Sequence, residues 1–252
     1  MTGRIAHGGK TIYGARIGIL ILETRFPRIP GDSGNALTWP FPVLYKVVKG
    51  ANHKTVVLDK AKDIIDDFVA GANELVEMGA DGITTTCGFL SVIQEELRNR
   101  CGVPVAASSL LQVSFVQPLL PPGKRVGIIT ESAKNLTPEH IAAAGAPADT
   151  PVVGIEHGDE FTTTFNRNEM EMDVAAAERD LLKGGEEMVA KHPDVGAVVL
   201  ETANMLPFTR ALSQHMGLPV YDLYSLVCWL HAGLEPHDFG HPGSAPRDFR
   251  KR

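Results

Sequence analysis

The sequence predicts an α/β protein built from two pseudo-symmetric units, each with a parallel sheet flanked by helices. Two observations support this prediction. Short β-branched runs alternate with longer stretches of helical periodicity, and landmarks of the first half recur in the second. With 252 residues and 44% hydrophobic side chains, the chain can build one large domain or two ordinary ones.

Buried parallel strands are expected where apolar and β-branched residues form short continuous runs. Such runs cover residues 16–22, 82–86, 103–108, 125–130, 197–201 and 218–223. Between them, apolar residues at a spacing of three and four predict helices over 59–79 and 173–192. A third helix is expected over 89–100, directly after the second strand.

The repeat is visible in two pairs of motifs. "RIGIL" at residue 16 recurs as "RVGII" at 125, and "GVPV" at 102 recurs as "GLPV" at 217. The second offset matches Cys87 with Thr202. Landmarks in the same order at nearly the same offset indicate duplication. The alternative is that "GxPV" only marks a turn from a helix into a strand.

The repeat suggests how the chain is divided. The first unit is predicted to comprise residues 14–107 together with 220–235, and the second 108–219. The segment 241–252, which is rich in polar and basic residues and proline, is predicted to be a disordered tail.

Composition limits the partners and the setting. A net charge of −6 provides no broad basic surface, which argues against nucleic acid as a partner. No apolar run is long enough for a membrane span or a secretory signal. Three cysteines without framework spacing favour free thiols in a reducing compartment, so a cytoplasmic protein is expected.

The strand tips carry the candidate functional residues, because open parallel sheets bind ligands beyond the carboxyl ends of their strands. The first tip reads "TTTCGF" and ends in Cys87 and Gly88. Glycine allows close approach of a ligand, and free backbone N–H groups favour an anion such as a thiolate or a carboxylate. The alternative is that Cys87 is a small buried apolar residue, as most free cysteines are.

The matching tip reads "LETANM" and contains Thr202 and Asn204. The Thr202 hydroxyl donates and accepts hydrogen bonds but does not ionise near neutral pH, so it is a poor base by itself. Glu201 is expected either to partner a helix dipole or to be exposed, with a structural role.

Taken together, "GADGITTTCGF", "VVLETANMLPF" and "GLPVYDLYSLV" resemble the aspartate/glutamate racemase superfamily over roughly residues 14–235. That superfamily includes cofactor-independent amino-acid and hydantoin racemases, maleate isomerases, arylmalonate decarboxylases and a sulfoniopropionate lyase branch. The resemblance implies two pseudo-symmetric α/β domains with the site in the cleft between them. It also implies no cofactor and no metal, a small carboxylate or amino acid as the substrate, and compatibility with a homo-oligomer.

The resemblance also implies roles for particular residues. Racemases of this group use two cysteines that face opposite sides of the substrate α-carbon. The first falls on Cys87 and the second on Thr202, which is not a cysteine, so these two are the predicted catalytic residues. The predicted substrate-binding residues are Ser33, Asn35, Thr85, Thr86, Gly88, Phe89, Thr130, Ala203 and Asn204.

The function that follows is proton transfer at the carbon α to a carboxylate, with a cysteine as acid and base. An isomerase of the racemase type is the first expectation. Because threonine cannot act as a thiolate, a lyase or decarboxylase that uses one base is the alternative. A carboxylate-binding protein without catalytic activity is the remaining one.

Overall fold

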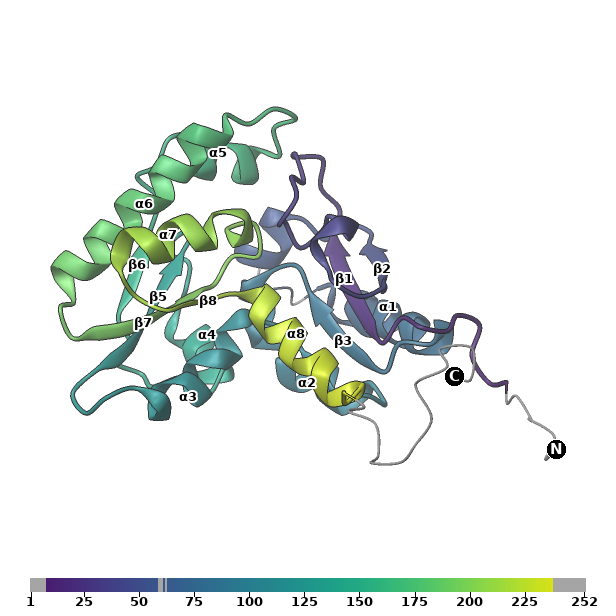
Figure 1. The fold of residues 1–252 in the computed structure, drawn as a ribbon. Helices are drawn as coiled ribbons and strands as arrows, with labels where there is room; N and C mark the ends of the chain where they lie inside the picture. The colour runs from purple at the N-terminus through teal and green to yellow at the C-terminus, as the bar shows by residue number, and fades with distance from the viewer. Residues whose placement is uncertain (1–7, 59–60, 62, 238–252) are drawn as a thin grey trace, which may run out of the picture.

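A computed structural model describes residues 8–58, 61 and 63–237 and contains two four-stranded sheets, both parallel throughout. The two sheets lie side by side with helices around them (Figure 1). The predicted fold class, two similar α/β units, is confirmed.

The first sheet has the strand order β2-β1-β3-β4. Three of its strands match predicted runs, whereas β2 was not predicted. In β2, Lys46 interrupts the apolar pattern and most of the strand is only half-buried, as expected at the edge of a sheet. The strands are β1 (Ile17–Leu22), β2 (Val43–Val48), β3 (Gly82–Thr85) and β4 (Val105–Ala106).

The second sheet has the order β6-β5-β7-β8, which repeats the order of the first. This shared topology agrees with the repeat seen in the sequence. The edge strand β6, of three residues, was not predicted. The strands are β5 (Arg125–Thr130), β6 (Val152–Gly154), β7 (Val195–Leu200) and β8 (Val220–Tyr221).

Eight α-helices occur in the described part of the chain, and most cover the faces of the sheets (Figure 1). The predicted helix over 173–192 corresponds to α6, which begins after Asp173, whose side chain accepts a hydrogen bond from the Ala176 N–H (3.0 Å). Of the predicted helix 59–79, residues 65–78 form α1, and residues 59, 60 and 62 lie outside the described residues. The helices are α1 (Ile65–Met78), α2 (Gln94–Arg100), α3 (Gln112–Val116), α4 (Pro138–Ala143), α5 (Glu160–Arg167), α6 (Val174–Lys191), α7 (Thr209–Met216) and α8 (Leu223–Leu234).

The segment after Cys87 differs from its prediction. Instead of one α-helix over 89–100, a 3₁₀ helix (Gly88–Ile93) precedes α2. The dipole next to Cys87 is therefore that of a short 3₁₀ turn, whose hydrogen-bond geometry is poorer than that of an α-helix.

The return of the chain to the first unit occurs after β8. Val220 and Tyr221 pair with β7 and therefore belong to the second sheet, although the sequence assigned them to the first unit. Helix α8 then packs against β3 and β4 of the first sheet. The division of the chain into units otherwise stays a prediction, and the tail 241–252 lies outside the described residues.

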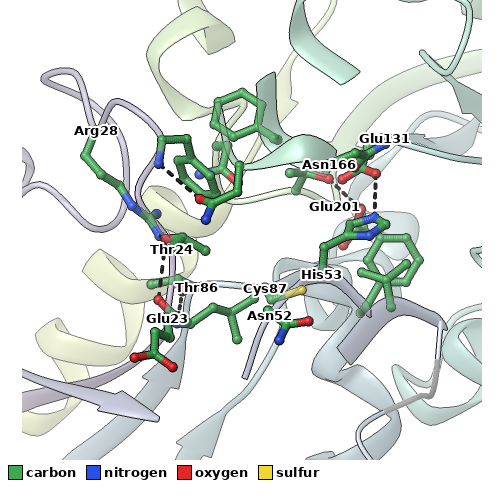
Figure 2. A pocket seen from close by; sticks show the side chains of 18 residues that line it. Glu23, Thr24, Arg28, Asn52, His53, Thr86, Cys87, Glu131, Asn166 and Glu201 are labelled. Atoms are coloured by element: carbon green, nitrogen blue, oxygen red, sulfur yellow. Dashed lines mark hydrogen bonds and ion pairs between the residues drawn. The ribbon is translucent and has the colours of Figure 1, made fainter. Parts of the chain in front are cut away.

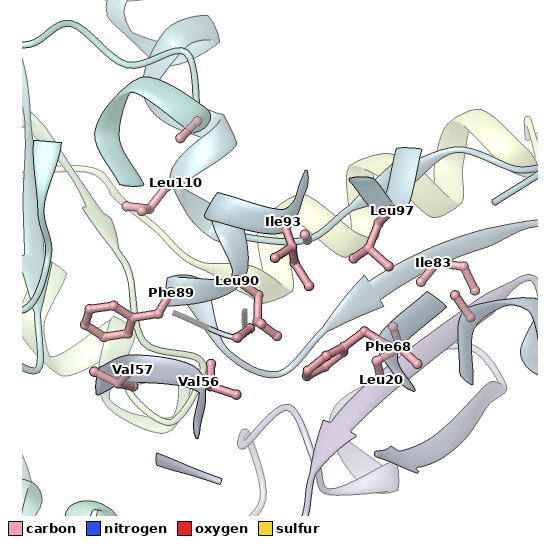
Figure 3. Close-up of a cluster of buried hydrophobic side chains, with 14 of the residues drawn as sticks. Leu20, Val56, Val57, Phe68, Ile83, Phe89, Leu90, Ile93, Leu97 and Leu110 are labelled. Carbon is pink, nitrogen blue, oxygen red and sulfur yellow. The ribbon is translucent and has the colours of Figure 1, made fainter. Parts of the chain in front are cut away.

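The largest buried apolar cluster joins the two units. It includes Leu20 and Phe68 of the first unit together with Val126 and Ile128 of the second. Figure 3 shows its central part, with Phe68 against Leu20 and Phe89 near Val57. A shared core fixes the sheets relative to each other, so side chains at their facing ends are held in defined positions. Within the described residues, no helix combines the length and apolarity that a bilayer crossing needs.

Candidate active site

A cavity of about 410 Å³ lies at the carboxyl ends of the inner strands of both sheets. The chain enters its wall directly after β1, β3, β5 and β7 (Figure 2). Both units therefore line one pocket, as open parallel sheets lead one to expect. Its lining residues are Leu22, Glu23, Thr24, Phe26, Arg28, Asn52, His53, Val57, Thr86, Cys87, Phe89, Glu131, Phe165, Asn166, Asn168, Glu201, Thr202 and Asn204.

The two predicted catalytic residues, Cys87 and Thr202, both line this cavity. Their strand tips are in direct contact. A Cβ atom at residue 88 would overlap the carbonyl oxygen of Glu201 and lie 2.9 Å from its carbonyl carbon. Gly88 is therefore required for the close approach of the two tips.

The electrostatics of Cys87 contradict the expected thiolate. Burial raises the pKa of the Cys87 thiol far above its usual value, and the negative charges of Glu201 and Glu131 raise it further. The N–H groups of Phe89 and Leu90 favour the anion, as the sequence suggested, but their effect is smaller. Cys87 is thus a neutral thiol at neutral pH.

This state predicts slow alkylation. At pH 7.5, iodoacetamide should modify Cys87 far more slowly than a thiol of ordinary pKa in a solvent-exposed peptide. Glu201→Gln should accelerate the reaction at the same pH, because removing the negative charge lowers the pKa of Cys87. Peptide mass spectrometry over a pH series measures both rates. Rapid modification of the wild-type thiol below pH 8 would contradict the assignment.

Glu201 is buried rather than exposed, which corrects one of the two sequence interpretations. Its Oε2 accepts hydrogen bonds from the hydroxyls of Thr202 (2.6 Å) and Thr130 (2.9 Å). Its Oε1 is buried and has no hydrogen-bond partner among the described residues. Burial raises the pKa of Glu201 to about 7, although these hydroxyls favour the charged form.

Three of the predicted substrate-binding residues line the cavity, namely Thr86, Phe89 and Asn204. The Asn204 amide donates to the carboxylate of Asp32 (2.7 Å). This bond ties the loop after β1, which contains the predicted residues Ser33 and Asn35, to the tip of β7.

The other six predicted substrate-binding residues do not line the cavity. Ser33 and Asn35 lie in the loop after β1, where the Asn35 side chain caps a short 3₁₀ helix. The Thr85 hydroxyl donates to the carbonyl of Ala107 (2.6 Å), and Thr130 donates to Glu201. Gly88 fits against Glu201, and Ala203 is buried in a neighbouring apolar cluster. These residues support the walls from behind.

Several residues of the wall were missed by the sequence analysis. His53 follows β2, the strand that was not predicted, and its Nε2 pairs with Glu131 Oε1 at 3.1 Å across the cavity. This contact with Glu131 raises the pKa of His53. Arg28 donates to Asp32 (2.8 Å) and Thr24 (2.9 Å). Of the segments that supply these missed residues, only the loop after β1 had contained predicted site residues, namely Ser33 and Asn35.

The cavity combines acidic and aromatic surfaces. Three carboxyl groups line it, whereas its basic groups are Arg28 and His53, each paired with an acidic side chain. Phe26 and Phe165 form an edge-to-face pair with centroids 4.7 Å apart, and the Arg28 guanidinium lies 4.5 Å above the Phe26 ring. The Phe26 face is thus already covered by the cationic side chain of Arg28. Among the described residues, no set of three or more His, Cys, Asp or Glu side chains is arranged to hold a metal ion.

Comparisons with solved structures define the class of fold. A Gly74Cys mutant of arylmalonate decarboxylase matches 90% of the chain and 96% of its own length, with a TM-score of 0.59 at 16% identity. Glutamate racemase from Bacillus anthracis matches 88% of the chain and 83% of its own length, with a TM-score of 0.55 at 11% identity. The protein therefore shares the two-unit α/β fold of these solved structures, which is the fold that the resemblance predicted.

Curated proteins of similar sequence share the name dimethylsulfoniopropionate lyase. A dimethylsulfoniopropionate lyase from Durusdinium sp. clade D is 26% identical over 82% of this chain and 71% of its own length. Dimethylsulfoniopropionate lyase 5 from Emiliania huxleyi is 24% identical over 86% of the chain, which spans 45% of that protein. No family model matches the sequence.

Proposed function

We propose that this protein is an enzyme that removes the proton α to the carboxylate of a small acid, and that the reaction is a β-elimination. The observation that carries the proposal is that the two groups that flank the cavity differ in their chemistry. One is the half-buried, neutral thiol of Cys87, and the other is the Thr202 hydroxyl bound to a buried carboxylate. An elimination needs a proton acceptor on one face, whereas symmetric racemisation needs each face both to accept and to donate.

The lining also suits a substrate with a positive charge. A sulfonium group at the β-carbon suits a lining that carries three carboxyl groups and the phenyl ring of Phe165. The similarity to dimethylsulfoniopropionate lyases supports the same substrate class.

In the proposed reaction, the Cα–H bond breaks and its electrons form a carbon–carbon double bond. The bond from Cβ to sulfur breaks at the same time, and its electron pair leaves with dimethyl sulfide. The proton is taken up by the protein and finally released to solvent, so that acrylate and one proton accompany the sulfide.

A second candidate function is a racemase. The presence of a thiol and a hydroxyl on facing strand tips supports it, since the thiol can return a proton to the face opposite the acceptor. The similar folds of glutamate and allantoin racemases are compatible with it.

An incubation in D₂O separates these functions. With dimethylsulfoniopropionate, we expect dimethyl sulfide by gas chromatography and acrylate in equal amount by proton NMR. With amino acids and malonates we expect neither loss of optical rotation nor carbon dioxide. Inverted, deuterated amino acid without an alkene would establish the racemase. Carbon dioxide release would identify a decarboxylase, and turnover of none of these compounds would contradict the proposal.

A further inference from the structure

Thr202 is not isolated at the tip of β7. Its hydroxyl donates to Glu201 Oε2 over 2.6 Å, and both residues line the cavity. A hydroxyl whose proton is already directed to a carboxylate can take up another proton on its oxygen as its own proton leaves. The pair can therefore perform chemistry that threonine alone cannot.

Hydrogen bonds from residues outside the cavity hold Glu201 in place. Thr130, at the end of β5, donates to the same Oε2 from outside the cavity. The Ser109 hydroxyl lies within hydrogen-bonding distance of the carbonyl oxygens of Leu200 (2.6 Å) and Glu201 (2.9 Å), which fixes the backbone of the tip. These contacts leave Glu201 little freedom to turn away from Thr202.

The surroundings of Glu201 shift the pKa of its carboxyl group toward neutral pH. Burial raises its pKa to about 7, and the charge of Glu131 raises it in the same direction. The hydroxyls of Thr202 and Thr130 and the Glu131 N–H lower it. The Cys87 thiol is neutral, and His53 contacts Glu131 rather than Glu201. A proton acceptor with a pKa near the working pH is efficient.

We propose that Glu201, acting through the Thr202 hydroxyl, is the proton acceptor of the β7 face and takes the place of a second catalytic thiol. The Thr202 oxygen forms a bond to the α-proton of the substrate while its own O–H bond breaks and that proton passes to Glu201 Oε2. Glu201 becomes a neutral acid and loses the proton to solvent after the product leaves. Glu201 does not touch the substrate in this step, so it is a positioning residue for Thr202 that receives the proton from the Thr202 hydroxyl. This inference rests on the proposed function.

The test uses Glu201→Gln in the 252-residue chain, with dimethylsulfoniopropionate as the probe. Glutamine keeps the size of the side chain but cannot accept the proton, so kcat should fall by about 10²–10⁴-fold. The kcat of Thr202→Val should fall by a similar factor, whereas Thr202→Ser should retain activity. The kcat of the double variant Glu201→Gln/Thr202→Val should be no lower than that of the poorer single variant. Thermal unfolding of each variant shows whether the fold is kept.

The pH profile distinguishes a proton acceptor from a merely structural residue. In the wild type, kcat/KM should rise with pH through a pKa of about 7, because the carboxylate is the active form. Glu201→Gln should lose this limb. Thr130→Val is the matched control, since it removes a hydrogen bond to the same oxygen without touching the cavity. Because that bond lowers the pKa of Glu201, its loss should move the limb to higher pH.

The outcomes separate the two proposals. A wild-type protein that turns over none of the test acids contradicts the proposed function, and the inference falls with it. A wild type that produces dimethyl sulfide, with an unchanged limb in both Glu201→Gln and Thr130→Val, overturns only the role of Glu201. Additive losses in the double variant would likewise show that Glu201 and Thr202 do not act as one unit.

Discussion

Gly88→Val is expected to remove nearly all turnover and to destabilise the fold. A side chain at residue 88 would overlap the carbonyl of Glu201, which Ser109 holds in place. The tips of β3 and β7 must then separate. Separation costs about 1–3 kcal/mol of the free energy of unfolding by overpacking. A displacement of about 1 Å between the groups that flank a substrate can lower the rate about 10²-fold.

Gly102→Ala is the matched control for this prediction. No heavy atom lies within 4 Å of the position that a Cβ would take at residue 102, which is exposed. Its unfolding midpoint in urea and its turnover should therefore be close to those of the wild type. Unchanged turnover in Gly88→Val, measured beside this control, would show that contact between the tips is not needed.

Phe89→Ala is expected to have the largest effect on stability. Phe89 is buried and lines the cavity (Figure 3). Its ring meets that of His140 edge-on, with centroids 5.3 Å apart. Truncation leaves a void in the core shared by the two units and should cost about 3–5 kcal/mol of the free energy of unfolding. The widened cavity should also raise KM, because the ligand loses an apolar wall.

Phe115→Ala serves as the control for loss of a phenyl ring. Phe115 is 39% exposed and stacks on Trp229 with centroids 5.6 Å apart, away from the cavity. Its removal should cost much less than that of Phe89, and KM should not change. Equilibrium unfolding and steady-state kinetics on the two variants give the comparison. Equal destabilisation would contradict the central place given to Phe89.

The sequence alone determined the fold class, because the inner strands are short runs of apolar and β-branched residues that repeat in order. Runs such as 125–130 are buried on both faces, and burial of this kind leaves a clear signal in composition. The edge strand β2 is half-buried and contains Lys46, so its pattern resembles that of a loop. Missing β2 also meant missing His53, which follows it in the chain.

The repeat further determined that Cys87 and Thr202 would share a pocket, since matching strand tips of two similar units face a common cleft. Their neighbours in the sequence were less informative. Thr85 and Ala203 belong to the same tips, yet their side chains face the supporting core. Which residue of a tip faces the cavity depends on the local turn that ends each strand.

The tertiary structure alone decided how the site ionises. From the sequence, Gly88 and the N–H groups after it favoured a thiolate at Cys87. In the folded chain, desolvation raises the pKa of Cys87, and the charges of Glu201 and Glu131 from the other unit raise it further, so that together they outweigh those dipoles. Ionisation depends on the summed field of groups far apart in the sequence and on exclusion of water, and both arise only when the two units pack together.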